Sequence, residues 1–145
     1  MSQAAMHSLQ ADAVNVGDNV TPLEIEVTAT AIVAGAIATR DYMPMHHDRD
    51  FAQAQGAPDI FFNIFSTNAY ISRFVTEWAG PEAILKNINI RLGVQAVPGQ
   101  MLIYTGTVTG KSIEGDECVI DLAIKGTVAT GDHATGTVSL TLPAN

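Results

Sequence analysis

Cysteine and charge are both scarce in this chain of 145 residues. The one cysteine, Cys118, excludes an intramolecular disulfide and a cysteine-rich zinc site, and its position in an expected strand indicates a small core residue. Charged residues make up 15% of the sequence and apolar residues 47%, so a monomer would expose much apolar surface. We therefore expect the chain to form an oligomer.

Positive charge is especially scarce, because seven Lys and Arg against fifteen Asp and Glu give a net charge of −8. Nucleic acids and anionic membranes bind basic surfaces, so we expect neither as a partner. The sequence has no apolar run long enough to span a bilayer and no secretory signal at its start. The expected location is therefore the cytoplasm.

Two motifs that identify common classes of enzyme are also missing. The pattern Gly-x-Gly-x-x-Gly of dinucleotide-binding folds does not occur, and no serine lies in the Gly-x-Ser-x-Gly of serine hydrolases. The adjacent His46 and His47 have no third ligand at a suitable spacing, because His7 and His133 lie far away in the sequence. We expect no cofactor and no metal site.

The hydrophobic pattern predicts one domain. Residues 1–15 have no clear period and are expected to form a flexible tail, so the single domain would cover residues 16–145. Apolar and polar residues alternate over 23–28, which predicts a half-buried strand. The small apolar run 31–38 fits a strand or a short helix, and its β-branched residues and glycine favour the strand.

Two helices are predicted in the middle of the chain. Asp48 is expected to cap a short helix over 49–55 that ends at Gly56. Asp59 is expected to cap a long helix over 60–79, stopped by Gly80 and Pro81. Apolar residues three and four apart give this helix its buried face: Phe61, Ile64, Phe65, Ile71, Val75 and Trp78.

The rest of the chain predicts antiparallel strands over 84–94, 101–112, 117–129 and 134–142. One long apolar helix and one antiparallel sheet bury each other only if the sheet curls around the helix. The sequence therefore predicts an α+β fold in which an antiparallel sheet wraps around one long central helix.

The residues most suited to chemistry are Asp41 and His46, which lie five positions apart across a turn that contains Pro44. A carboxylate and an imidazole that meet beside an apolar cavity move protons to and from water near neutral pH. This chemistry suits the addition of water to a double bond, or its removal. The alternative is a structural turn in which Asp41 caps the chain and His46 packs or faces solvent.

The pattern Asp41-x-x-Pro44-x-His46-x-Asp48, with the short helix, a glycine and a proline after it, resembles the MaoC-like enoyl-CoA hydratases, which have the hotdog fold. Their usual motif is Asp-x-Asn-Pro-x-His-x-Asp, and Met43 replaces its Asn. The likeness extends from about residue 16 to 142. It is greatest to the small, single-hotdog subunits of hydratases for steroid side-chain CoA thioesters, through residues 38–41, 46–50, 78–81 and 91–94.

This resemblance implies a function and a site. The reaction would be addition of water to a trans-2-enoyl-CoA thioester to give an (R)-3-hydroxyacyl-CoA, with a water held between Asp41 and His46. Asn63 stands where the family usually has a glycine whose N–H meets the thioester oxygen, so Asn63 is the expected substrate-binding residue; alternatively it only lies in the first helical turn. The resemblance also implies a bulky steroid-derived acyl chain and a homodimer or heterotetramer with a second hotdog subunit.

Two other functions remain open from the sequence. A hotdog acyl-CoA thioesterase would use a carboxylate to activate water at the carbonyl carbon instead of the alkene. A non-catalytic subunit would only bind acyl-CoA or complete a partner's site. The order of the motif favours the hydratase over the first, and the presence of both Asp41 and His46 argues against the second.

Overall fold

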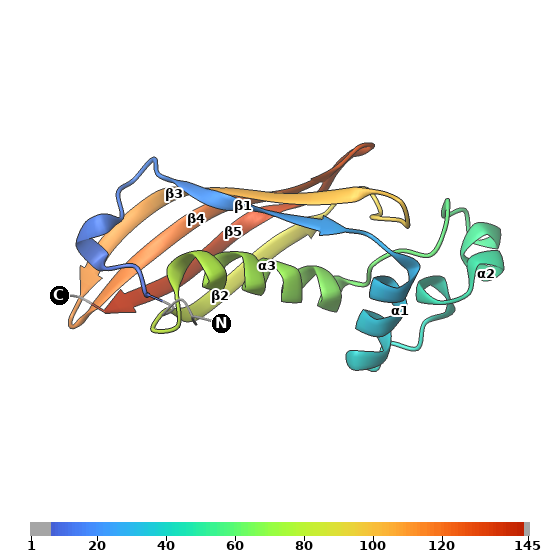
Figure 1. The fold of residues 1–145 in the computed structure, drawn as a ribbon, viewed down its shortest axis with the longest axis horizontal. Coiled ribbons are helices and arrows are strands. Elements are labelled where there is room, and N and C mark those ends of the chain that lie inside the picture. The colour runs from blue at the N-terminus through green and yellow to red at the C-terminus, as the bar shows by residue number, and fades with distance from the viewer. Residues whose placement is uncertain (1–6, 144–145) are drawn as a thin grey trace, which may run out of the picture.

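A five-stranded antiparallel sheet lies over one long helix in the computed structural model, which describes residues 7–143 (Figure 1). The strands follow the order β1-β3-β4-β5-β2, and every neighbouring pair is antiparallel. The predicted α+β architecture is therefore confirmed. The strands are β1 Asn19–Glu26, β2 Ile84–Leu92, β3 Met101–Glu114, β4 Glu117–Val128 and β5 Gly131–Pro143.

The helix under the sheet, α3 Ile64–Ala79, packs its apolar face against the inner side of the strands. Phe74 stacks on Tyr104 of β3 with the ring centroids 6.0 Å apart. Gly106 of β3 makes room for this contact, because a Cβ there would lie 3.3 Å from the Phe74 ring. Gly80 ends the helix at φ +90°, as the sequence predicted. No helix within residues 7–143 has the length and apolar character to cross a membrane.

The predicted start of α3 was wrong. Its N-cap is Asn63, whose side chain accepts the N–H of Ser66, and not Asp59. The Asp59 carboxylate instead accepts hydrogen bonds from Nε of Arg49 and from the backbone N–H of Ile60. Residues 60–63 therefore precede the helix as a non-helical segment.

The predicted buried face of α3 was correct only in its C-terminal half, where Ile71 and Val75 are fully buried. In the first turn Ser66 and Thr67 are buried instead. The apolar residues Ile64 and Phe65 are 44% and 55% exposed.

The run 31–38 fitted a strand or a short helix, and the preference for the strand was wrong. It belongs to a helix, α1 Ala29–Ala38, capped by Thr28, whose hydroxyl accepts the N–H of Ala31. Five of its ten residues are alanine, the strongest helix former, and they outweigh Gly35 and the β-branched residues. The helix α1 lies against the start of α3 (Figure 1). Gly35 permits the close approach, since a Cβ there would collide with Oγ of Ser66.

The short helix α2 Arg49–Ala54 was predicted correctly, with Asp48 as its N-cap and Gly56 after its end at φ +89°. A single 3-10 turn, η2 Pro44–His46, precedes it. Both α1 and α2 lie at the end of the molecule where α3 begins (Figure 1). That end carries Asp41 and His46.

Part of the expected N-terminal tail is packed against the fold. A 3-10 turn, η1 Ala11–Ala13, buries Ala11, and Val14 after it is also buried. The ammonium of Lys111 donates to the carbonyls of Ala11 and Val14, and the N–H of Leu9 donates to Ala79. The expected tail over residues 1–15 thus makes contacts with the domain through residues 9–14, and residues 1–6 lie outside the described residues.

Candidate active site

The structure brings Asp41 and His46 together: Oδ2 of Asp41 lies 3.4 Å from Nε2 of His46. The side chain of His46 is 9% exposed and that of Asp41 22% exposed, so both are shielded but reachable. Asp41 follows α1, and His46 ends the turn η2. The two side chains therefore meet from separate elements, and each is held by its own set of contacts.

The backbone of Asp41 is fixed by the way α1 ends. Its N–H donates to the carbonyl of Ala36 at 2.9 Å, and the N–H of Arg40 donates to Ile37 at 3.1 Å. These two bonds form a Schellman motif, which requires a left-handed residue after the helix. Arg40 fills that position at φ +55°, where glycine is usual. The turn thus directs Asp41 away from the helix axis at a cost in backbone strain.

Two donors hold the Asp41 carboxylate. The side-chain amide of Asn63 donates to Oδ2 at 2.9 Å, and the backbone N–H of Met43 approaches Oδ1 at 3.3 Å. The Asn63 bond is the main reason that the pKa of the Asp41 carboxyl lies below its usual value; the Met43 N–H and His46 add to it, and partial desolvation opposes it. Asp41 is therefore a carboxylate at neutral pH.

The His46 ring is held by the segment before α3. Its Nδ1 lies 2.7 Å from the carbonyl oxygen of Phe61, and the Phe61 ring meets the imidazole edge-to-face at 5.1 Å. A carbonyl only accepts, so Nδ1 carries the proton and a neutral His46 presents the lone pair of Nε2 to Asp41. Two acceptors then face each other, and a water molecule that donates one hydrogen to each fits this arrangement.

Asn63 joins the two halves of the site. Its Oδ1 accepts the N–H of Ser66 at 2.8 Å, and its Nδ2 donates to Thr39 and Asp41, both at 2.9 Å. The residue is only 3% exposed. Sequence reasoning placed Asn63 at the site as a helix-start donor but missed its bond to Asp41. An N-cap role was readable from the residue type, whereas a bond across 22 positions was not.

Sequence reasoning also set aside His133, which the structure buries behind α3. Its Nε2 lies 2.9 Å from Oγ1 of Thr67, and its Nδ1 donates to the carbonyl of Val94 at 2.8 Å. Burial lowers the pKa of the His133 imidazole, and the Val94 bond offsets this only in part. Nε2 of a neutral His133 accepts a hydrogen bond from the Thr67 hydroxyl, and this bond ties the first turns of α3 to β5.

The other residues considered for metal binding do not converge. His47 is exposed, and Asp48 accepts the N–H of Phe51 as the cap of α2. Within residues 7–143 no group of three His, Cys, Asp or Glu side chains has the arrangement of a metal site.

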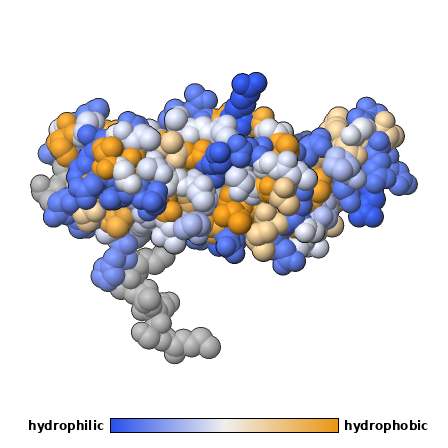
Figure 2. Space-filling model, turned by 90° about the horizontal axis from the view of Figure 1, so that it is seen from above, coloured by the Kyte–Doolittle hydropathy of each residue, from blue (hydrophilic) through white to orange (hydrophobic). Residues whose placement is uncertain are grey.

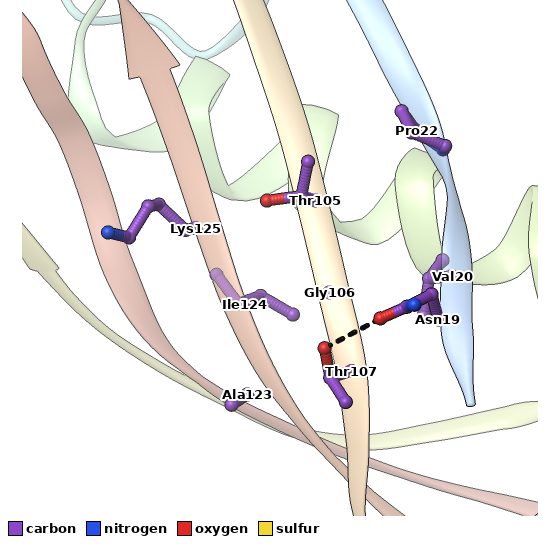
Figure 3. Close-up of a pocket in the computed structure, with 9 residues that line it drawn as sticks. All are labelled: Asn19, Val20, Pro22, Thr105, Gly106, Thr107, Ala123, Ile124 and Lys125. Carbon is purple, nitrogen blue, oxygen red and sulfur yellow. Dashed lines mark hydrogen bonds between the residues drawn. The ribbon is translucent and has the colours of Figure 1, made fainter. Parts of the chain in front are cut away.

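A separate hollow of about 560 Å³ lies on the outer face of the sheet (Figure 3). Thr105 and Thr107 line it and alternate with Tyr104 and Gly106, which face α3. Its lining has a hydrogen bond between Thr107 and Asn19 but no carboxylate or imidazole. Polar and apolar side chains are intermixed over the face seen from above (Figure 2). Lys125 is the titratable side chain in its lining, so the hollow has no carboxylate–imidazole pair of the kind that Asp41 and His46 form.

Several exposed apolar side chains belong to the elements that carry Asp41 and Asn63. They come from α1, from the loop after Asp41 and from the first turn of α3: Ile37 at 60%, Tyr42 at 68%, Met43 at 47%, Ile64 at 44% and Phe65 at 55% exposed. A shallow apolar depression lies along α1 itself, lined by Ala29, Thr30, Val33, Ala34 and Ile37. An apolar ligand or partner suits such a surface.

Comparison with known proteins gives one informative sequence relative. No family model matches the chain. The 3-oxo-4,17-pregnadiene-20-carboxyl-CoA hydratase beta subunit of Mycobacterium tuberculosis is 40% identical over 127 residues, which are 88% of this chain and 95% of that protein.

Solved structures agree with this relative. A chain of the ChsH1–ChsH2 complex from Mycobacterium tuberculosis matches with a TM-score of 0.82 and 40% identity, over 88% of this chain and 98% of that one. The R-hydratase PhaJ1 from Pseudomonas aeruginosa matches with a TM-score of 0.84 over 95% of this chain and 88% of that one. Its identity is 16%, so it supports the fold alone.

Proposed function

Because this chain belongs to the MaoC-like, hotdog-fold enoyl-CoA hydratases, we propose that it adds water reversibly to a trans-2-enoyl-CoA thioester and forms a 3-hydroxyacyl-CoA. The observation that carries this function is the pair of Oδ2 of Asp41 and Nε2 of His46, 3.4 Å apart. One is a carboxylate oxygen, and the other is the free nitrogen of a ring whose Nδ1 is tied to Phe61.

The pair would orient and activate the attacking water. A water that donates to both acceptors directs a lone pair of its oxygen toward the β-carbon of the substrate. As the C–O bond forms at the β-carbon, one water proton passes to the pair, and the pair delivers a proton to the α-carbon. Water is thereby added as OH and H, and the pair returns to its starting state.

The thioester oxygen gathers negative charge during this addition and needs a donor. The side-chain amide of Asn63 is fully engaged with Thr39, Asp41 and Ser66, so it is not the donor. We assign the role of donor to the thioester oxygen to the backbone N–H groups at the start of α3, beside Asn63. The positive end of the α3 dipole also favours negative charge there.

The acyl group and the partner follow the relative. We propose a steroid-derived acyl chain, because the relative is named for such a substrate and exposed apolar side chains lie on the elements that carry Asp41 and Asn63. The relative is a beta subunit, and the matching structure is a complex, so we propose a homodimer or a heterotetramer with a second hotdog subunit. The single, buried Cys118 fits the reducing cytoplasm, which we propose as its location.

A product assay tests this function against its alternatives. The purified chain, alone and with any copurifying subunit, is incubated with a trans-2-enoyl-CoA. The products are then separated, and their masses are determined by mass spectrometry. The hydratase yields a CoA thioester heavier by one water. Release of free CoA would instead identify a thioesterase, which the hydratase relatives do not favour. Unchanged substrate in both preparations would leave the non-catalytic binding subunit as the remaining alternative.

A further inference from the structure

We propose that Asn63 is a positioning residue that fixes the orientation of the Asp41 carboxylate toward His46. The proposal rests on the proposed function in one respect, because it takes Asp41 as a catalytic group. It adds a role for a side chain that neither touches the reacting atoms nor has space to touch them, since Asn63 is 3% exposed and fully hydrogen-bonded.

The surrounding groups determine which way the Asn63 amide points. The backbone N–H of Ser66 is a donor, so it requires the amide oxygen, Oδ1, on its side. The NH₂ group must then point toward Thr39 and Asp41. The Thr39 hydroxyl donates to the carbonyl of Gly35 at 2.8 Å, which leaves its oxygen free to accept from Asn63. Each group thus has one role, and the NH₂ group is held against Oδ2 of Asp41.

The Asn63 bond is the shorter of the two that hold the Asp41 carboxylate, at 2.9 Å against 3.3 Å for the Met43 N–H. It also engages the same oxygen, Oδ2, that lies 3.4 Å from Nε2 of His46. Loss of this bond leaves the carboxylate free to rotate about its Cβ–Cγ bond and turn Oδ2 away from the water position.

Capping alone does not account for asparagine at this position. Asp, Ser and Thr cap helices about as well as Asn, because a cap needs only an oxygen acceptor. A residue that caps α3 and also donates to Asp41 needs an oxygen and an N–H on one short side chain. Asparagine meets both needs, whereas an aspartate in its place would set a second carboxylate against Asp41 and a serine would lack the amide donor.

The electrostatics of the site agree with this geometry. Within residues 7–143, His46 is the titratable side chain whose charge acts on Asp41; the other groups around the carboxylate are the neutral Asn63, Thr39 and the Met43 backbone. Of all these, the Asn63 bond does most to lower the pKa of the Asp41 carboxyl. Removal of the donor would raise that pKa, which gives the proposal a readout independent of turnover.

The test compares two variants that retain the cap and lose the donor, Asn63→Ser and Asn63→Asp, in the assembled protein. The measurements are kcat, KM, the pH profile of kcat/KM and the Asp41 carboxyl titration by ¹³C NMR. Thr28→Ala is the matched control, because it removes the cap of α1 and leaves every contact of Asp41 in place. Asp41→Asn is measured in parallel to test the proposed function itself.

We expect kcat to fall at least about tenfold in Asn63→Ser and further in Asn63→Asp, because a misplaced reacting group costs rate even when the fold persists. The Asp41 titration and the acidic limb of the pH profile should both move to higher pH. Thr28→Ala should lower the melting temperature and leave both the Asp41 titration and the acidic limb of the pH profile unchanged. Asn63→Asp retains the test if Asn63→Ser does not fold.

Two results would overturn the role of Asn63: an unchanged Asp41 titration with wild-type kcat in the variants, or an equal loss of kcat in Thr28→Ala at equal loss of stability. Full activity of Asp41→Asn would overturn the proposed function instead. The ¹³C titration still reports in that case whether Asn63 controls the carboxylate, so the two failures are distinguishable.

Discussion

Nδ1 of His46 donates to the carbonyl oxygen of Phe61 at 2.7 Å, and two residues later Asn63 donates to Asp41 at 2.9 Å. One short segment before α3 thus orients both members of the pair. Between them the N–H of Phe62 donates to the carbonyl of Ala96 at 3.2 Å, which ties the segment to the loop before β3. The geometry of the pair therefore depends on contacts made by residues outside the pair.

The left-handed conformation of Arg40 predicts opposite effects for two substitutions. Arg40→Gly should raise the free energy of unfolding by about 1 kcal/mol, because glycine adopts φ +55° without the steric cost of a Cβ. Arg40→Val should lower it by at least about 1 kcal/mol, because a β-branched residue is disfavoured there. Urea unfolding measures both. Equal stability of the two variants would show that the turn before Asp41 is unstrained.

The contact between Gly35 and Ser66 predicts a destabilising change at a helix position where alanine is ordinarily favourable. Gly35→Ala should lower the free energy of unfolding by about 1–3 kcal/mol, because the new Cβ collides with Oγ of Ser66. That Oγ is buried and has no hydrogen-bond partner among the described residues, so Ser66→Ala alone should cost little.

The double variant Gly35→Ala with Ser66→Ala is the control for this contact, measured by thermal or urea unfolding. It should recover part of the loss, because the colliding oxygen is gone. A double variant no more stable than Gly35→Ala would contradict the close packing of α1 on α3.

Burial of His133 predicts a loss of stability in mild acid. Its folded pKa lies below the ordinary value of 6.5, so the unfolded chain binds a proton first as the pH falls. The contribution of neutral His133 is complete above that value and is lost as the pH falls through it toward the lower folded pKa. The free energy of unfolding should therefore fall more steeply below pH 6.5 in the wild type than in His133→Gln.

His47→Gln is the matched control for His133, since it removes an exposed imidazole in place of a buried one. The free energy of unfolding of His47→Gln should have the same pH dependence as that of the wild type. The burial of His133 would be contradicted if His133→Gln and His47→Gln gave the same curve.

The proposed steroid-derived acyl chain predicts a preference for bulky substrates. The ratio kcat/KM should be higher for a ring-bearing enoyl-CoA than for crotonyl-CoA, because a wide acyl group has more apolar surface to bury against the exposed apolar side chains at this end of the chain. The comparison requires the isolated chain and the chain with any copurifying hotdog subunit. Equal kcat/KM values for the two substrates in both preparations would contradict the steroid-derived substrate and would still be consistent with a general enoyl-CoA hydratase.

The sheet and the C-terminal half of α3 were predictable because their signals are local. Ile71 and Val75 lie on one helical face, and the strands alternate between buried and exposed residues, as in β4 from Cys118 to Val128. The helix α1 was taken for a strand because its β-branched residues and Gly35 were given more weight than its five alanines, which are the strongest helix formers.

The proximity of Asp41 and His46 was predictable from the sequence, and the contacts that hold the two side chains were not. Asp41 and His46 lie close in the sequence, and a turn between them suffices to bring them near each other. The supports of the pair come from residues 15 and 22 positions away, Phe61 and Asn63, and no local pattern encodes such pairings. The same holds for His133 and Thr67, which are 66 positions apart.

The most direct test of the account is the turnover of Asp41→Asn and His46→Ala on a trans-2-enoyl-CoA with a steroid-derived acyl chain. Each variant is first shown to fold and assemble as the wild type does, and His47→Ala serves as a neighbouring control. We predict that each of the two loses at least about a hundredfold in kcat, the usual effect of removing a positioned acid or base. Near-wild-type turnover by either folded variant would contradict the assignment of this pair as the catalytic site.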